Sequence, residues 1–124
     1  MADRRPTIER FEPRPLGPKD WGTELLVAHT PFYTGKLMLM RAGTQGPLQY
    51  HEHKDETFFV FSGRAWIEFD PGTGLVKRAV EAGSSIHIPP GAVHRVGAVT
   101  DCVLFEASTP HFEDRINVED QYPA

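Results

Sequence analysis

A short segment near the middle of the chain combines two histidines and a glutamate in a spacing that suits metal binding. His51 and His53 are two positions apart, and Glu56 follows shortly after them. In a β-strand, side chains at positions i and i+2 point to the same face, so we expect the two imidazoles to share one face. A bulge or bend before Glu56 would bring its carboxylate back to the same point. Gln49 precedes His51 on the same predicted face and is expected to contact metal, water or substrate.

A second segment supplies a third imidazole. A Pro-Pro-Gly turn is followed shortly by His94, at the expected start of a new strand. The combined set of His51, His53, Glu56 and His94 suits one divalent transition metal (Mn, Fe, Zn, Ni, Co or Cu) and leaves positions open for a substrate. The chain has a single cysteine, distant from these histidines, which argues against a closed structural zinc site.

Other charged residues are candidates for catalysis or for holding a substrate. Glu56, if it does not bind the metal, or an inward carboxylate such as Glu106 could move a proton. Lys36 and three arginines are the candidates for binding an anionic substrate, although charged side chains on strands most often face solvent. The three arginines are Arg41, Arg64 and Arg95.

The elements that would position these residues are short β-strands. The chain has eleven glycines and eleven prolines, which lie between short apolar segments. No long segment keeps a helical period, so the pattern predicts an all-β sandwich or small barrel. The expected strands are 25–29, 36–40, 49–53, 56–61, 65–69, 75–80, 86–88, 94–99 and 102–107.

Composition limits the partners and the location. With 124 residues the chain fits one domain, and its net charge of −4 argues against a nucleic-acid partner. No apolar segment approaches the length of a membrane span, and no signal peptide is expected. A single cysteine excludes an internal disulfide and fits a cytoplasmic location.

Both segments resemble the two motifs of the cupin superfamily. The first motif is matched by Gly46, His51, His53, Glu56 and Gly63, although the gaps before His51 and after His53 are each one residue shorter than in the motif. The second is matched by Gly83, Pro89, Gly91 and His94, with Ala98 in place of the closing asparagine. The resemblance implies a single-domain jelly-roll β-barrel that holds one metal, with His51, His53, Glu56 and His94 as the ligands.

Within that superfamily the chain is similar to the single-domain cupins related to the C-terminal domain of type II mannose-6-phosphate isomerases. The similarity rests on 19–22 (Lys-Asp-Trp-Gly), on 48–56 and on 119–122 (Glu-Asp-Gln-Tyr). It departs at the end, where those proteins have Gly-Arg and this chain has Pro-Ala. It suggests a lead segment 1–17, a barrel 18–110 and a C-terminal tail 111–124 that packs on the barrel or on a partner.

The resemblance implies a metal-dependent enzyme that acts on a small polar molecule, with an aldose–ketose isomerase as the leading hypothesis. A cupin dioxygenase or decarboxylase using Fe or Mn would need the same ligands. A non-catalytic sugar-binding or regulatory cupin is a third possibility, because one fold supports many functions.

The alternation of inward and outward side chains along the strands further predicts a homodimer. If Glu56 faces the interior, Phe58 and Val60 do so too, and Phe59 and Phe61 face outward. Trp66 on the next strand is expected to join them on the outer face. Such large aromatic side chains are seldom left in water, so we expect either the N-terminal segment or a second subunit to cover them, and we predict a homodimer through this sheet.

Overall fold

The computed structural model describes residues 5–122 as an almost entirely β structure. The chain forms eleven strands and one short 3₁₀ helix within this range. They are β1 (Arg14–Lys19), β2 (Gly22–His29), β3 (Thr34–Met40), β4 (Gln49–Tyr50), β5 (Glu56–Ser62), β6 (Arg64–Phe69), β7 (Val76–Glu81), β8 (Ser85–Ile88), β9 (His94–Ala98), β10 (Cys102–Ser108), β11 (Ile116–Asn117) and η1 (Glu119–Gln121). The structure confirms the predicted all-β fold.

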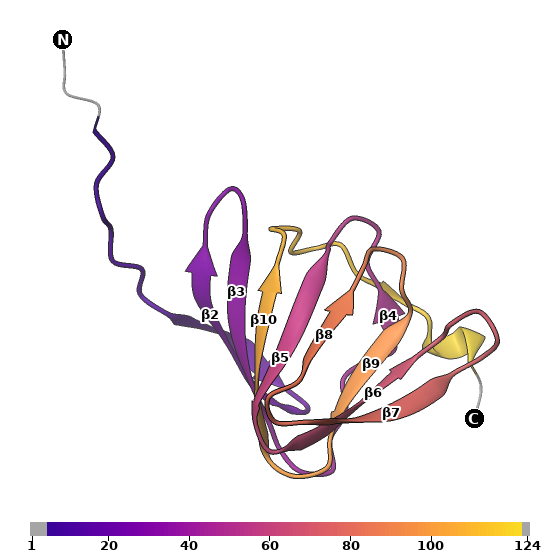
Figure 1. Cartoon of the computed structure of the whole chain (residues 1–124). Coiled ribbons are helices and arrows are strands. Elements are labelled where there is room, and N and C mark those ends of the chain that lie inside the picture. Colours follow the sequence, from indigo (N-terminus) through magenta and orange to yellow (C-terminus); the bar gives the residue numbers. More distant parts are fainter. Residues whose placement is uncertain (1–4, 123–124) are drawn as a thin grey trace.

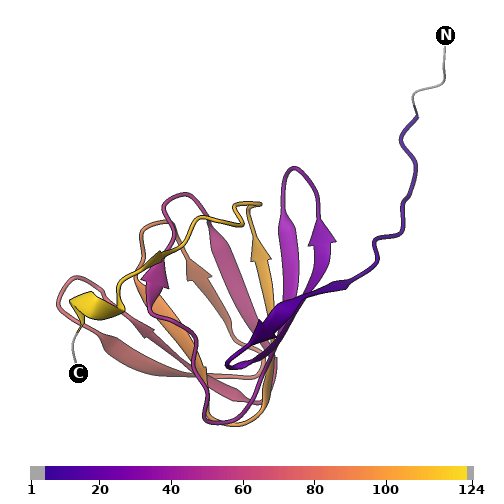
Figure 2. The same ribbon diagram turned by 180° about the vertical axis from the view of Figure 1, so that it is seen from behind.

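The strands form two antiparallel sheets that face each other as a jelly-roll barrel (Figure 1). The six-stranded sheet has the order β1-β2-β3-β10-β5-β8, and the five-stranded sheet has the order β11-β4-β9-β6-β7. The view from behind shows the chain after β10 crossing from the first sheet to the second, where η1 lies beside the β6–β7 hairpin (Figure 2). Strands that are distant in sequence are therefore neighbours in the barrel.

Alternation along the strands separates the interior from the outer surface. In β5, Glu56, Phe58 and Val60 are buried, whereas Phe59 is half-buried and Phe61 is exposed. This confirms the parity expected for β5, because successive side chains of a strand point to opposite faces.

The barrel interior has an apolar part and a polar part. Two methionines of β3, Leu104 and Val60 belong to one buried apolar cluster. Toward the other ends of the same strands, the buried residues are polar or charged, and register places them opposite one another. These polar residues are Thr34, Lys36, Glu56, Glu106 and Ser108. Charged groups are seldom buried without partners, so this end of the barrel is where function is expected.

Two expectations about the elements need correction. The strand expected at 49–53 ends at Tyr50, so the two-residue alternation does not extend to His53. The first strand begins at Arg14, before the expected barrel boundary at residue 18. The tail contains the short strand β11, which lies on the barrel and pairs with β4. Residues 1–4 of the expected lead segment and 123–124 of the expected tail lie outside the described residues.

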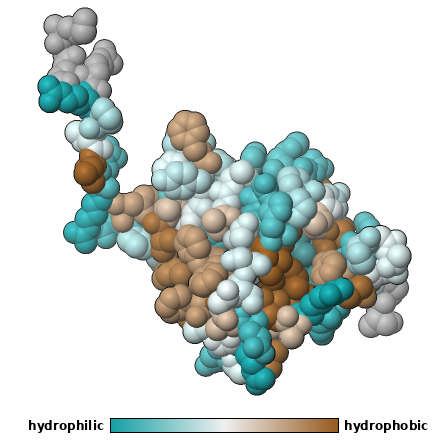
Figure 3. All heavy atoms as spheres, in the orientation of Figure 1, coloured by the Kyte–Doolittle hydropathy of each residue, from teal (hydrophilic) through white to brown (hydrophobic). Residues whose placement is uncertain are grey.

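The outer face of the six-stranded sheet is apolar. Its outward side chains, here called the outer apolar face, are Leu25, Leu37, Leu39, Phe59, Phe61, Val103 and Phe105. The brown area on the left of Figure 3 lies over β2, β3 and β10. Trp66 is not part of this face, contrary to expectation, because β6 belongs to the other sheet. There the ammonium of Lys77 lies 4.0 Å from the Trp66 ring centroid.

Within residues 5–122, the structure contains no helix that is long and apolar enough to cross a membrane.

Candidate metal centre

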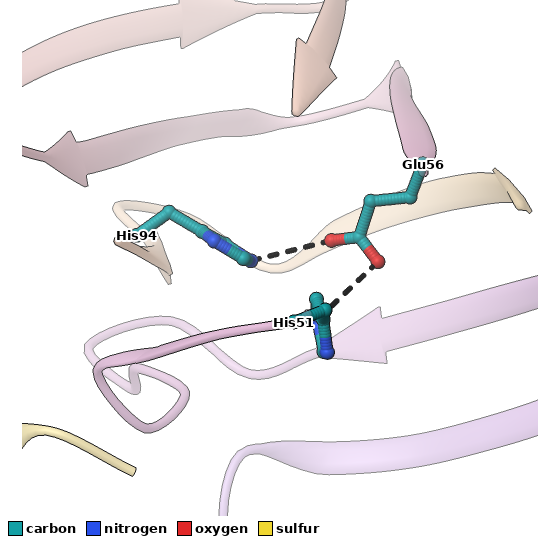
Figure 4. A group of neighbouring side chains, drawn as sticks. All are labelled: His51, Glu56 and His94. Carbon is teal, nitrogen blue, oxygen red and sulfur yellow. Dashed lines mark ion pairs between the residues drawn. The ribbon is translucent and has the colours of Figure 1, made fainter. Parts of the chain in front are cut away.

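Three buried side chains meet at the polar end of the barrel with the donor atoms that a metal ion needs. One donor atom each from His51, Glu56 and His94 lies within 4.8 Å of the other two. The carboxylate of Glu56 points between the two imidazoles (Figure 4). Its oxygens lie 3.2 Å from His94 Nε2 and 3.6 Å from His51 Nε2. Donor atoms that share one transition metal at about 2.0–2.2 Å lie about 3–3.5 Å apart, so the spacing fits an ion.

Strand ends place these three residues. Glu56 is the first residue of β5, and His94 is the first residue of β9, three positions after the glycine of the Pro-Pro-Gly turn. His51 follows the last residue of β4, which pairs with β9 through Gln49 and His94. Because β5 and β9 belong to different sheets, the ligand set bridges the interior of the barrel.

Backbone carbonyl groups fix the orientation of both imidazoles. The Nδ1 of His51 donates to the Asp114 carbonyl at 2.6 Å, and the Nδ1 of His94 donates to the Ala92 carbonyl at 2.8 Å. The Nε2 atom of each ring then presents its lone pair to the interior, as in metal-binding histidines. Burial lowers the pKa of His51, although the nearby Glu56 carboxylate opposes this shift. A neutral imidazole is the form that binds a metal.

Three buried atoms of the kind that bind metals, on residues that line this cavity, have no hydrogen-bond partner within residues 5–122: His51 Nε2, Gln49 Oε1 and Glu56 Oε2. Glu56 Oε2 forms an ion pair with Lys54, which leaves His51 Nε2 and Gln49 Oε1. A buried polar atom without a partner is costly, and such atoms in a native structure often indicate a missing ion or water. A divalent cation held by the three ligands would satisfy the imidazole nitrogen of His51. Gln49 lines the same cavity as the three ligands, so it is placed to contribute a fourth.

This arrangement changes the register of the first motif. Gly43, Gln49, His51, Glu56 and Gly63 reproduce its spacing, with five residues before Gln49 and four between His51 and Glu56. Gln49 then occupies the place of the first histidine and His51 that of the second. The two short gaps were the signal for this register in the sequence: moving the pair back by two residues restores the gap before Glu56, and taking Gly43 instead of Gly46 as the first glycine restores the other.

His53, expected as a ligand, lies outside the centre. Its side chain is 70% exposed, and its nearest charged partner is the exposed Glu52. The physical reason is that the chain leaves the strand after Tyr50, so His51 and His53 no longer share a face. Within the described residues, His53 is absent from the group that could hold a metal.

Asp114, which the sequence analysis did not identify, holds the loop that carries His51. Its carboxylate accepts the backbone N–H groups of Glu52, His53 and Lys54 at 3.0, 2.6 and 2.8 Å. Although desolvation raises the pKa of Asp114, these three donors outweigh it and hold the pKa at about 2. The same residue therefore fixes the loop through its carboxylate and the His51 ring through its carbonyl. No sequence signal pointed to it, because it lies 60 or more positions away.

Lys54 is a second residue that the sequence analysis missed. Its ammonium lies 2.9 Å from Glu56 and 3.0 Å from Glu106, and its side chain is only 9% exposed. Burial lowers the pKa of Lys54, but the two carboxylates outweigh this effect and raise it overall. Although burial raises the pKa of Glu56, contacts with His94 and Lys54 bring it down to about 2. The cavity thus holds a charged lysine between two carboxylates.

The remaining candidates divide between the cavity and the surface. Glu106 is 4% exposed, lines the cavity and accepts a hydrogen bond from Ser108. Arg95 also lines the cavity but is paired with Glu68 and Glu119. The other two arginines do not line it: Arg41 donates to the Asp20 carbonyl, and Arg64 is exposed at the start of β6. These two arginines are therefore not placed to bind a substrate in this cavity.

The fold is shared with solved structures of several activities. CapF of Staphylococcus aureus, a capsular polysaccharide assembling protein, matches with a TM-score of 0.75 at 20% identity, over 87% of this chain and 32% of CapF. KdgF from Halomonas sp. matches with a TM-score of 0.66 at 22% identity, over 77% of this chain and 89% of KdgF. Oxalate decarboxylase of Bacillus subtilis, described with Mn(II) centres, matches with a TM-score of 0.70 at 15% identity, over 86% of this chain and 30% of that protein.

The chain thus spans about a third of the length of CapF and of the decarboxylase. No curated protein matches it. The model of the cupin domain family matches residues 36–108, which include Gln49, His51, Glu56 and His94. This match covers more than half of the chain, and the protein therefore belongs to the cupin domain family.

Proposed function

We propose that this protein is a metal-dependent cupin enzyme that binds one divalent transition metal per subunit and acts on a small polar substrate. His51, Glu56 and His94 hold the metal, and Gln49 supplies a further ligand through its amide oxygen. The observation that carries the proposal is the pair of buried donor atoms without partners: His51 Nε2, which lies 3.6 Å from the Glu56 carboxylate, and Gln49 Oε1, whose side chain lines the same cavity. Two nitrogen and two oxygen donors suit Mn, Fe, Zn, Ni, Co or Cu.

The best-supported reaction is a proton transfer between neighbouring carbons, as in an aldose–ketose isomerase. A metal in this centre would polarise a carbonyl or hydroxyl group of the substrate. Glu106 supplies the proton-transfer group, because it faces the same cavity and does not belong to the ligand group. Ser108 and Lys54 hold its carboxylate in place at 3.0 Å each. The similarity of 48–56 to the mannose-6-phosphate isomerase relatives supports this choice.

Decarboxylation or oxygen-dependent cleavage is the second candidate. It is favoured by the structural match to oxalate decarboxylase. Two readouts separate the candidates: a dioxygenase consumes oxygen and a decarboxylase releases carbon dioxide, whereas isomerisation does neither. A cupin that only binds its ligand would show neither activity with any metal.

The first experiment is elemental analysis of untagged protein purified without chelator. We expect about one equivalent of a transition metal per subunit, because one centre is formed. The variants His51→Ala and His94→Ala should lose it. His53→Ala is the matched control: it also removes a histidine from the same loop, but it should keep the metal. The proposal is wrong if the wild type neither contains nor takes up metal, and the register is wrong if His53→Ala loses it.

The second experiment tests the reaction. Metal-loaded protein is mixed with aldoses and their phosphates under anaerobic conditions, and ketose formation is followed by NMR. Glu106→Gln should abolish turnover while metal content stays at the wild-type value. Oxygen uptake or carbon dioxide release with carboxylic acids as substrates would instead support the second candidate.

We also propose that the protein forms a homodimer through the outer apolar face. Phe61 is 69% exposed and Leu39 is 38% exposed, and both lie on this face. Seven apolar side chains on one sheet surface form a patch of the kind that marks an interaction site. The two-fold arrangement would place the same patch of each subunit against the other.

A further inference from the structure

The inner cavity is lined by more positive than negative side chains, although the whole chain has a net charge of −4. Glu24, Glu56 and Glu106 are its three carboxylates. The positive residues are Lys19, Lys36, Lys54, Arg95 and Arg115. A bound divalent metal would add to this excess. A cavity of one sign attracts ligands of the other sign, and its low-dielectric walls strengthen that attraction.

Three of these five positive residues are neutralised by neighbouring carboxylates. Lys54 lies between Glu56 and Glu106, and Lys36 lies 3.7 Å from Glu24 and 4.0 Å from Glu106. Arg95 is likewise paired, with Glu68 and Glu119. Their charges are therefore largely satisfied within the protein.

Lys19 and Arg115 are different. Across residues 5–122, neither takes part in a described ion pair or side-chain hydrogen bond. Lys19 is the last residue of β1, and Arg115 directly precedes β11. The barrel thus brings together two unpaired cations from the two ends of the chain.

These two residues lie where the inner cavity joins a second hollow. The inner cavity has a volume of about 110 Å³, and the adjoining hollow has about 330 Å³. Both are lined by Lys19, Trp21 and Arg115. Ligand sites usually enclose about 300–1,000 Å³, so the inner cavity alone would hold only the reacting end of a substrate. The rest of the molecule would extend past Lys19 and Arg115.

The outer hollow also contains two acidic residues, Asp20 and Glu119. Glu119 is engaged by Arg95 and by the backbone N–H of Leu48. Among residues 5–122, Asp20 is then the one carboxylate lining this hollow that opposes Lys19 and Arg115, so the entrance to the inner cavity carries a net positive charge.

We propose that Lys19 and Arg115 bind the anionic group of the substrate, a carboxylate or a phosphate, while its reacting end lies beside Gln49, His51 and His94. This inference rests on the proposed function, since it assigns a substrate class to the same centre. Arginine can bind either group through two parallel hydrogen bonds, and lysine adds a point charge. The substrate is then a small organic acid or a phosphate ester of about the size of a hexose.

Matched ligands test the proposal by isothermal titration calorimetry, with ¹⁵N-labelled protein followed by NMR. The probes are glucose 6-phosphate, glucuronate and glucose, which share a sugar ring and differ in charge. We expect both anions to bind and to shift the amide signals of Lys19, Trp21 and Arg115, whereas glucose does not. The double variant Lys19→Gln/Arg115→Gln should bind the anions at least about tenfold more weakly, because two charged hydrogen-bond donors are lost.

The control variant removes one lysine and one arginine elsewhere. Lys77→Gln/Arg64→Gln changes the net charge by the same amount at residues that line neither hollow, and it should bind like the wild type. If the control weakens binding equally, if glucose binds as well as the anions, or if neither anion binds, the proposal is wrong.

Performing each titration on metal-free and metal-loaded protein separates this proposal from the proposed function. Anion binding to metal-free protein that depends on Lys19 and Arg115 supports the entrance site even if no activity is found. Anion binding that requires metal and is unchanged in the double variant shows direct coordination only, and it overturns the entrance site while leaving the metal centre intact.

Discussion

Replacing Lys54 by methionine should destabilise the metal-free protein strongly. Methionine has a similar length and fits an apolar setting, but it removes the cation between Glu56 and Glu106. Both carboxylates are almost fully buried, at 3% and 4% exposure. Their negative charges would then lie in the barrel with no cation within 3 Å.

The size of the effect follows from this burial. Removing one partner of a buried ion pair costs about 3–5 kcal/mol, because the remaining charge is left without compensation. A small domain has a free energy of unfolding of about 5–15 kcal/mol, so a large part of the stability is at risk. With a urea m-value of about 2 kcal/mol/M, the midpoint should fall by about 1.5–2.5 M.

The assay is urea unfolding at pH 7 with chelator present, followed by tryptophan fluorescence and circular dichroism. Lys77→Met is the control, because this lysine is at the surface over the Trp66 ring and its loss should change the midpoint little. The double variant Lys54→Met/Glu106→Gln should recover part of the loss, since it also removes one of the uncompensated charges.

A midpoint for Lys54→Met within about 0.3 M of the wild type would refute the reasoning, because it would correspond to well under 1 kcal/mol. It would mean that Lys54 is not needed to neutralise the cavity. Failure of the double variant to recover any stability would indicate lost packing rather than uncompensated charge.

Three further predictions follow from the same geometry. The pKa of Glu56 is about 2 in the folded protein against an ordinary value of 4.5, so its ionised form stabilises the fold above pH 4.5. Metal-free protein should therefore lose stability in acid titrations as the pH falls from about 5 to 2. In the variant Glu56→Gln this loss of stability should be smaller. Asp114→Ala should weaken metal binding by about 10- to 100-fold in competition with a chelator, since it frees the His51 loop, and wild-type affinity would contradict this role. Phe61→Glu should convert the dimer to a monomer by light scattering, and a wild type of about 14 kDa would exclude the dimer.

The order of strands along the chain was predictable because the signals are local. Glycine and proline mark the turns, and alternation marks which side chains of β5 and β10 face the interior. The expected strands 36–40, 56–61 and 102–107 agree closely with β3, β5 and β10. His51, Glu56 and His94 were identified from equally local signals: their spacing along the chain and their match to the two cupin motifs.

What the sequence alone could not supply depends on contacts between distant parts of the chain. The choice between His53 and Gln49 was decided by where β4 ends, and that end is set by pairing with β9 and β11. Asp114 holds its loop across 60 positions, and Lys54 meets Glu106 only because β5 and β10 are neighbours. Local patterns specify which residues face inward, whereas the closure of the barrel decides which of them meet.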